Sequence, residues 1–287
     1  MNPAAFKALD GEPTPEGDFG AVDAALQASV HPGQLTLVTG PTGTGKVTLA
    51  FKAALGLRDQ GRAAIFAPRE EGIISAHERA AFHAALHGAR AHDQIPIVIL
   101  PGMRFRDDAL LAGALLDAGV AVISFLHLTR PHGVQGRLGQ LSGAAHTATA
   151  LAARLSACVG LLRHLPKLCP ECSRPAELTE QERAVMAGIG VCHSTLRMRG
   201  AGSSSCNGLG RHRRWGHHPV FETLLPNAAM RRAAADGVSD AFPRALECPT
   251  TRAQVLHSWG DSVRSALNAG TLDPDAITKF AAEFGPT

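Results

Sequence analysis

Short apolar runs alternate with longer segments of helical periodicity through the first half of the chain. The short runs are rich in apolar and β-branched residues, as is typical of buried strands, and fall at 35–39, 63–67, 97–100 and 120–126. The longer segments predict helices near 45–59, 75–91, 107–118 and 146–164. Strands that alternate with helices predict an α/β fold with a mainly parallel sheet, covered by helices on both faces.

The chain changes character on either side of this α/β region. Residues 1–30 are rich in Pro, Gly and acidic groups and end in an apolar helix-like run, so we expect a lead-in to the first strand. From residue 169, Cys, His, Arg and Gly replace the apolar periodicity, and helical runs return at 227–236 and 251–267. We therefore predict four parts, at 1–30, 31–168, 169–222 and 223–287.

Composition limits the classes of function. A chain of 287 residues with 45% hydrophobic content can bury a substantial core, which fits one globular domain and a smaller appendage. The net charge of +3 indicates no strongly basic surface, so we expect no nucleic-acid partner. A local basic cluster at 211–214 is typical of a solvated loop, and a DNA-associated role through it is the weakest alternative.

Nothing in the sequence indicates export or a membrane span. The acidic N-terminal residues do not resemble a signal peptide. The apolar stretch 109–128 has the length of a span, but Asp117 and Gly119 interrupt it, so we expect a helix followed by a buried strand. Six cysteines without an export signal favour reduced thiols or metal ligands over disulfides. We expect a cytoplasmic protein.

A glycine-rich segment follows the first predicted strand and opens the first predicted helix. It reads Gly40, Pro41, Thr42, Gly43, Thr44, Gly45, Lys46. Glycines let the backbone wrap a phosphate closely, amide groups and the helix N-terminus supply positive potential, and the lysine reaches the terminal phosphates. The segment therefore predicts a phosphate loop that binds ATP.

One position after the lysine departs from the phosphate-loop pattern. A Ser or Thr hydroxyl normally coordinates magnesium there, whereas this chain has Val47. Thr48 comes next, but one helical step turns a side chain by about 100°, away from the metal. We expect phosphate binding by the backbone to survive and metal-assisted hydrolysis to suffer, which leaves magnesium an open question.

Two segments resemble the ATPases of type II secretion and type IV pilus assembly. HPGQLTLVTGPTGTGKVTLA is similar to the family's strand and phosphate loop, and AGVAVISFLHLT resembles its histidine box, with His127 at the histidine position. The resemblance spans about 31–235 and implies a RecA-like P-loop core at 31–168. It also implies a histidine near the nucleotide phosphates, assembly into hexamers, and binding to an inner-membrane platform from the cytoplasmic side. No segment resembles the family's large N-terminal domain, which puts platform binding through that domain in doubt.

The cysteines carry a third element of the resemblance. LCPEC followed by SSSC resembles the family's tetracysteine module, in which zinc takes four sulfur ligands, and predicts a zinc-knuckle-like module at 169–222. Cys169, Cys172 and Cys206 stand at three ligand positions and Ser203 at the fourth. The sphere is completed by Cys192, His193, His212 or a water, or the knuckle is metal-free. Cys158 and Cys248 fall outside the pattern and are expected to be buried thiols.

The fourth element of the resemblance lacks the family's carboxylates. The family has Gly-Glu-x-Arg-Asp after a strand, but here either Met103 or Arg104 takes the place of the glutamate, depending on register. An earlier acidic box is replaced by FAPREE, in which Glu70 or Glu71 can remain.

These losses leave two readings of the function open. One is an ATP-binding motor or degenerate motor subunit. The other is a non-hydrolysing scaffold or regulatory protein of the same machinery. A ring would need an arginine finger, for which Arg137 is one candidate.

Overall fold

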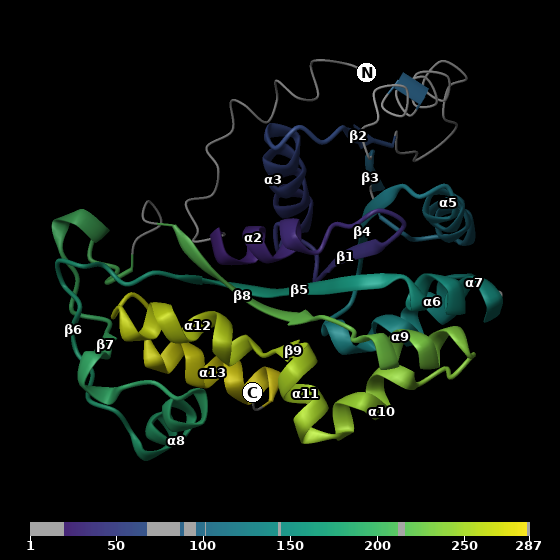
Figure 1. The fold of residues 1–287 in the computed structure, drawn as a ribbon. Coiled ribbons are helices and arrows are strands. Elements are labelled where there is room, and N and C mark those ends of the chain that lie inside the picture. The colour runs from purple at the N-terminus through teal and green to yellow at the C-terminus, as the bar shows by residue number, and fades with distance from the viewer. Residues whose placement is uncertain are drawn as a thin grey trace. The chain divides into compact units, whose positions relative to one another are not determined.

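The computed structural model describes residues 20–67, 87–88, 96–100, 102–142, 145–211 and 216–285 (Figure 1). They form two compact units, each with its own core. Unit 1 comprises Gly20–Leu161 and Glu222–Leu256, and unit 2 comprises Leu162–Phe221 and residues 257–285. The C-terminal region expected at 223–287 thus divides between the units at residue 256.

Unit 1 is built on parallel strands that alternate with helices. In chain order its first elements are α2 (Gly20–Ala28), β1 (Leu35–Thr39), α3 (Lys46–Asp59), β2 (Ala64–Phe66), β3 (Ile97–Leu100), α5 (Arg106–Asp117), β4 (Ala121–Leu126) and β5 (Leu155–Pro166). The strand order is β2-β3-β4-β1-β5, continued by β8 (His217–Leu224) and β9 (Leu256–His257). The pairs of β1 with β4, β1 with β5, β2 with β3 and β3 with β4 are parallel. The four strands predicted from the apolar runs, and the mainly parallel α/β fold, are confirmed.

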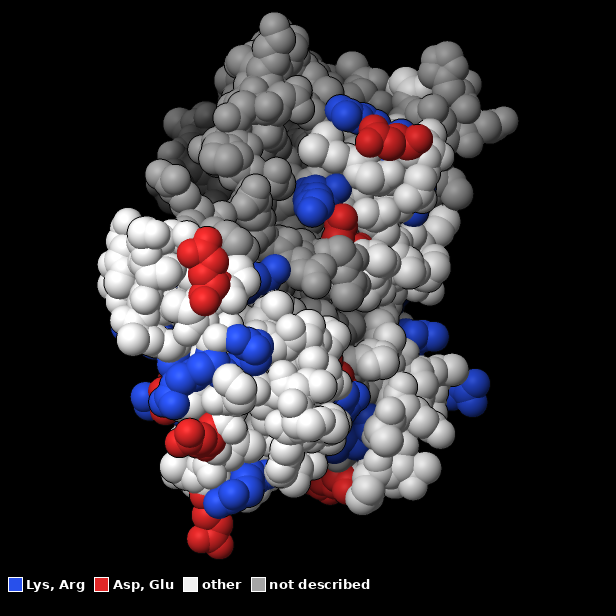
Figure 2. All heavy atoms as spheres, turned by 90° about the vertical axis from the view of Figure 1, so that its left-hand side faces the viewer, with Lys and Arg blue, Asp and Glu red and all other residues white. Residues whose placement is uncertain are grey.

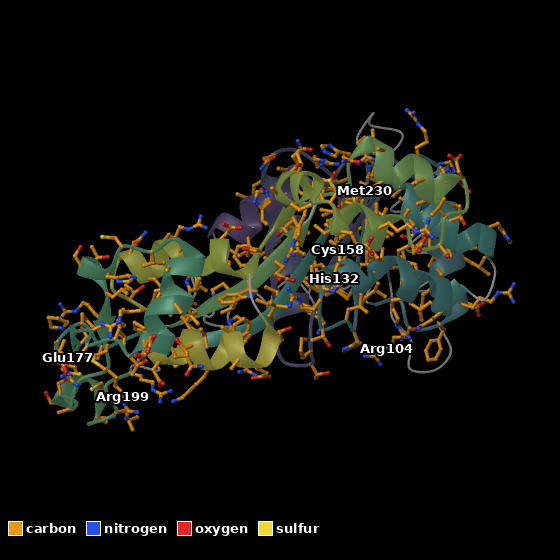
Figure 3. The ribbon with its side chains drawn as sticks, turned by 90° about the horizontal axis from the view of Figure 1, so that it is seen from below. Arg104, His132, Cys158, Glu177, Arg199 and Met230 are labelled. Carbon is orange, nitrogen blue, oxygen red and sulfur yellow. The ribbon has the colours of Figure 1, made fainter. Side chains whose placement is uncertain are left out.

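Helices cover both faces of this sheet. In Figure 1, α2 and α3 lie on one face, and α6 (Val134–Ser142), α7 (Ala145–Ala153) and α9 (Ala228–Ala235) lie on the other. Apolar side chains of the strands and of α5, α6, α7 and α9 form one core that includes Leu37, Val122 and Leu155, each fully buried. Cys158 and Met230, labelled in Figure 3, belong to the same core. Unit 1 is completed by η1 (Pro131–Gly133), α10 (Ala241–Glu247) and α11 (Pro249–Val255).

The helix predicted at 146–164 is wrong in its second half. The chain leaves α7 at Ala153 and forms β5 from Leu155, which pairs with Leu35 of β1. The Leu- and Ala-rich composition favours a helix, but tertiary burial beside β1 overrides local propensity. The run predicted at 251–267 is likewise broken, because β9 separates α11 from α12 (Trp259–Asn268). The helix expected at 75–91 lies largely outside the described residues.

Unit 2 packs short helices and turns around an aromatic centre. Its elements are β6 (Arg174–Pro175), α8 (Glu180–Ile189), η2 (His193–Thr195), β7 (Arg197–Met198), η3 (Ser204–Cys206), α12 and α13 (Pro274–Phe284), with the first part of β8. Trp259 and Phe280 pack edge to face with ring centroids 5.1 Å apart, and Phe280 stacks on Phe284 at 4.3 Å. The guanidinium of Arg163 lies 5.5 Å from the Phe284 ring centroid and is ion-paired to Glu283. Among the described helices of the chain, none combines the length and the apolar character that crossing a membrane requires.

Candidate functional site

Residues 40–46 form the turn that joins β1 to α3, and three glycines shape it. Gly40, Gly43 and Gly45 have φ of 141°, 83° and 77°, which side chains disfavour. A Cβ on Gly40 would also lie 2.1 Å from the carbonyl oxygen of Leu161 on β5. Position 40 therefore has no room for a side chain, and the backbone can curl directly off the strand.

The lysine of this turn points into the loop. The Lys46 Nζ donates hydrogen bonds to the carbonyl oxygens of Gly40 at 2.8 Å and Pro41 at 2.6 Å. The Thr44 hydroxyl donates to the same Pro41 oxygen at 2.9 Å. Lys46 is 7% exposed, and this burial lowers the pKa of its ammonium. The positive charge is thus held on the inner side of a glycine-lined turn at the N-terminus of α3.

The residue after the lysine has no group that binds a metal. Val47 is 53% exposed and presents only methyl groups at the position where a hydroxyl would coordinate magnesium. Thr48 is half-buried, one residue further along α3. Among the residues predicted for the loop, Pro41 and Thr42 are exposed, while Thr44 is buried.

His127 comes directly after β4, the strand that pairs with β1. Because Leu126 of β4 is level with Thr39 of β1, His127 leaves the sheet beside the start of the loop at Gly40. Its side chain is exposed. The parallel register therefore brings the predicted histidine and the predicted loop to the same edge of the sheet.

Neither register puts a carboxylate at the position where the family carries a glutamate. Met103 is 2% exposed, and its amide donates to the Phe125 carbonyl oxygen. Arg104 is exposed. The carboxylate of Asp108 accepts from the amides of Arg104 and Phe105 at 2.8 and 2.9 Å, so it caps α5. Glu70 and Glu71 lie outside the described residues.

An ion pair between Arg130 and Glu222, which the sequence does not indicate, follows His127 by three residues along the chain. Arg130 binds Glu222 of β8 through two nitrogens, with Nε 2.9 Å from Oε2. The Glu222 side chain is fully buried and that of Arg130 is 21% exposed. The neighbouring His132 has its pKa lowered by burial and by the positive charges of Arg130 and Arg252. No local signal marks this pair, because its members are 92 residues apart.

Three cysteines of unit 2, those that the resemblance to the tetracysteine module implies as ligands, lie together in the structure. The sulfur atoms of Cys169, Cys172 and Cys206 all lie within 4.8 Å of one another. Cys206 accepts hydrogen bonds from the amides of Ser203 at 3.1 Å and Gly210 at 3.2 Å. Contacts from the Ser203 hydroxyl and amide, more than that of Gly210, lower the pKa of the Cys206 thiol to about 6. A thiolate so stabilised fits a metal ligand, since the metal binds the deprotonated form.

Of the other side chains considered as ligands, Cys192 and His193 are described and do not belong to this cluster. Cys192 is exposed, with its sulfur 3.1 Å from the Ser194 hydroxyl, and His193 is not among the grouped side chains. His212 lies outside the described residues. Cys158 is buried as expected, which raises the pKa of its thiol to about 12. The expectation for Cys248 is wrong, because it caps the junction of α10 and α11 at the surface, where its thiol is exposed.

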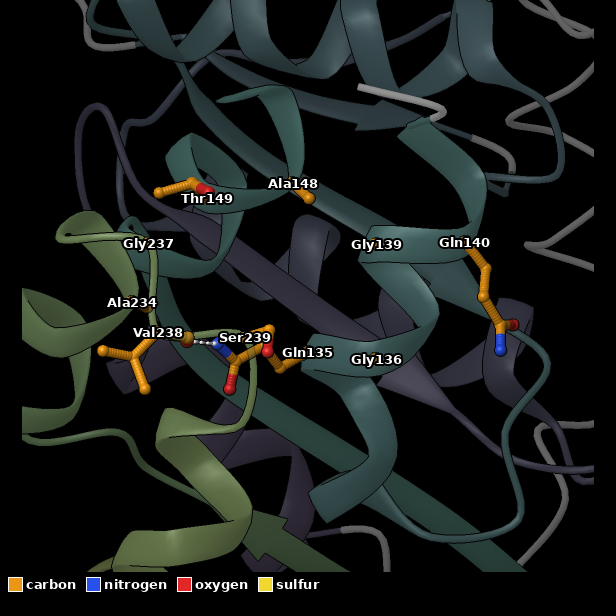
Figure 4. A pocket seen from close by; sticks show the side chains of 10 residues that line it. All are labelled: Gln135, Gly136, Gly139, Gln140, Ala148, Thr149, Ala234, Gly237, Val238 and Ser239. Atoms are coloured by element: carbon orange, nitrogen blue, oxygen red, sulfur yellow. Dashed lines mark hydrogen bonds between the residues drawn. The ribbon is translucent and has the colours of Figure 1, made fainter. Parts of the chain in front are cut away.

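Two surface features lie apart from the phosphate loop. A pocket between α6, α7 and the α9–α10 turn is lined mainly by small residues such as Gly136, Gly139 and Gly237, with Gln135 bonded across it to the Val238 carbonyl (Figure 4). On the face shown in Figure 2, basic and acidic side chains are intermixed among the residues described there. The candidate Arg137 bonds to Gln140 on its own helix.

The fold and the loop define the class of the protein. A glycine-rich turn between the first strand of a mainly parallel sheet and the following helix, with its lysine directed inward, is the core of a RecA-like P-loop NTPase. No family model matches the chain.

Two curated relatives and two solved structures are similar to the chain. It is 29% identical over 212 residues to type II secretion system protein E of Aeromonas hydrophila, covering 70% of this chain and 40% of that protein. It is 26% identical over 185 residues to the type IV pilus assembly ATPase PilB of Myxococcus xanthus, covering 57% of this chain and 30% of that one. The ATPases DotB of Legionella pneumophila and Yersinia pseudotuberculosis match the fold at TM-scores of 0.55 and 0.52. In both, the sequence identity is 13%, and the match covers 91% of this chain and 63% and 61% of theirs.

The chain is similar in sequence to ATPases of type II secretion and type IV pilus assembly, as its two sequence elements indicate, and its fold is similar to that of DotB. It spans less than half the length of the curated relatives it matches.

Proposed function

We propose that the chain binds ATP through residues 40–46 as a subunit of a type II secretion or type IV pilus assembly system. One observation carries the proposal: the Lys46 ammonium is held inside a turn whose glycines leave the backbone open to a phosphate. On binding, the ammonium exchanges the carbonyl oxygens of Gly40 and Pro41 for the β and γ phosphate oxygens. His127, at the same edge of the sheet, lies beside the outer phosphate.

The proposal includes slow or absent hydrolysis. Phosphoryl transfer depends on a metal that bridges the outer phosphates and on a group that orients the attacking water. Val47 binds no metal, Met103 is buried and apolar, and the Asp108 carboxylate is occupied as a helix cap. Magnesium would therefore be held by phosphate oxygens and water more than by the protein.

These same observations favour a second candidate, a scaffold or regulatory subunit that uses the nucleotide only to fix its conformation. Both candidates place the chain in the cytoplasm, at the inner-membrane platform of the system, within a ring of like or related subunits. Both also assign the three cysteines to a structural zinc ion.

Calorimetric titration of ATP and ADP tests the binding proposal. We expect saturable binding by the wild-type chain and a loss of at least about tenfold in affinity for Lys46→Ala. Lys52→Ala, which removes an equal charge two turns further along α3, is the matched control and should bind as wild type. Equal affinities in the three proteins would contradict nucleotide binding at this loop.

Turnover with magnesium then separates the two candidates. Lysine-dependent hydrolysis well above background would support the motor and reject the scaffold. Binding without such hydrolysis would support the scaffold.

A further inference from the structure

A fourth polar atom lies among the three cysteine sulfurs of unit 2. The Ser203 hydroxyl oxygen is 3.6 Å from the sulfur of Cys169 and 3.5 Å from that of Cys206. The sulfurs of Cys172 and Cys206 are 3.7 Å apart. The serine thus closes a compact group of three sulfurs and one oxygen.

These separations match the edges of a tetrahedron around one zinc ion. Zinc–sulfur bonds of about 2.3 Å and a zinc–oxygen bond of about 2.0 Å give tetrahedral edges of about 3.8 Å between sulfurs and about 3.5 Å between sulfur and oxygen. The Cys172–Cys206 separation and the two serine–sulfur separations agree with these values to within about 0.1 Å.

The backbone around the group is fixed by tight turns. Gly202, with φ of 106°, approaches Gly208 so closely that a Cβ would lie 2.5 Å from its Cα. A Cβ on Gly200 would lie 1.6 Å from the carbonyl oxygen of Cys172. The Gly208 amide donates to the Ser203 carbonyl at 3.0 Å. The fold therefore fixes the backbone of Ser203 beside the sulfurs, within reach of its hydroxyl.

We propose that Ser203 supplies the fourth ligand of a zinc site, completing a Cys₃Ser sphere with Cys169, Cys172 and Cys206. The inference rests on the zinc binding proposed above and adds the identity of the fourth donor. A hydroxyl carries less negative charge than a thiolate and is a harder ligand. Such a site holds zinc less tightly than four cysteines, and its metal is more readily exchanged.

Metal binding to variants of the full chain tests the proposal. Zinc affinity is measured by competition with a chromophoric chelator, and ligand number by the thiolate-to-metal absorption of the cobalt-substituted protein. We expect Ser203→Ala to lose about tenfold or more in affinity while keeping absorption from three thiolates. Ser203→Cys should gain at least about tenfold in affinity and show absorption from four thiolates. Ser204→Ala, next to it on the exposed side of η3, should behave as wild type.

The outcomes distinguish failure of the zinc proposal from failure of the serine proposal. If the wild type and Ser203→Cys both fail to bind zinc or cobalt, zinc binding at this cluster is wrong and the serine proposal falls with it. If the wild type binds and Ser203→Ala binds equally well, zinc binding stands and the fourth donor is a water or another group. Circular dichroism of each metal-free variant shows whether the fold is kept.

Discussion

At the scale of single residues, the loop keeps a residue suited to phosphate contact but lacks the one suited to metal binding. The two functions usually belong to adjacent residues of such a loop. Lys46 is buried and bonded to the turn, and the proposed function gives it contact with phosphate. Val47, the next residue, is exposed and presents methyl groups where a hydroxyl would serve the metal. Binding of the anion and handling of the metal can therefore be altered independently.

Val47→Thr restores the missing hydroxyl at an exposed position, so it should not disturb folding. We expect magnesium to increase ATP affinity in this variant by about tenfold more than in the wild type, since one bond to the ion is regained. The measurement is calorimetry with magnesium and with EDTA.

Val47→Ala provides the control for side-chain size and should show no added magnesium dependence. If Val47→Thr also responds to magnesium no more than wild type, the metal is not brought to this end of α3.

Prediction from sequence was uneven at this scale. The phosphate loop follows from local chemistry, because Gly and Lys at fixed intervals specify their own geometry. The sequence places Ser203 at the fourth ligand position, but it leaves the fourth donor open between Cys192, His193, His212 and a water, because only the fold shows which polar atom lies among the sulfurs. Cys248 was assigned to the interior because free cysteines are often buried, yet it occupies a surface helix junction.

At the scale of elements, the Arg130–Glu222 pair ties the segment after β4 to β8. Glu222 is fully buried in the strand, so its charge depends on the two nitrogens of Arg130. That dependence holds the chain that carries His127 against the sheet. Arg130 is thus a positioning residue for the predicted nucleotide edge.

Removing one partner of the pair should be costly. Arg130→Met leaves a buried carboxylate without its cation, and we expect a loss of about 3–5 kcal/mol in the free energy of unfolding. In the double variant Arg130→Met/Glu222→Gln the cost should be smaller than in the single one, because no uncompensated charge remains. Urea denaturation of the two variants and of Glu222→Gln measures the coupling.

Strictly additive losses in that cycle would mean that the two side chains act separately. Arg244→Met breaks an exposed ion pair with Asp240 and is the control for losing an arginine. It should lower the free energy of unfolding by no more than about 1 kcal/mol.

The strands show why element prediction succeeded in one place and failed in another. The runs at 35–39, 97–100 and 120–126 are rich in Val, Ile and Leu and carry their own strand signal. β5 reads LSACVGLLRHLP, in which Leu is the commonest residue, and its first half is extended because Leu155 to Gly160 pair with β1. Local sequence cannot report that partner.

At the scale of the whole molecule, the two units have separate cores. One is built on Leu37, Val122 and their neighbours, and the other on Trp259 and Phe280. We expect Trp259→Ala to lower the free energy of unfolding by about 3–5 kcal/mol. Protection from hydrogen exchange should fall mainly in 162–221 and 257–285. Hydrogen exchange followed by mass spectrometry measures this by segment.

Trp259→Phe keeps an aromatic edge toward Phe280 and should lose far less protection. An equal loss in both units from Trp259→Ala would show that they unfold as a single cooperative body, and would remove the basis for treating the units separately.

The narrow gap between Gly40 and the Leu161 carbonyl has a consequence for distant mutations. The Leu161 carbonyl oxygen of β5 packs directly against Gly40 of the turn. A methyl group at position 40 would not fit. A substitution anywhere along β5 that shifts this oxygen by a few tenths of an ångström would reshape the entrance to the turn. We therefore expect substitutions in β5 to change the affinity of the loop for the anion.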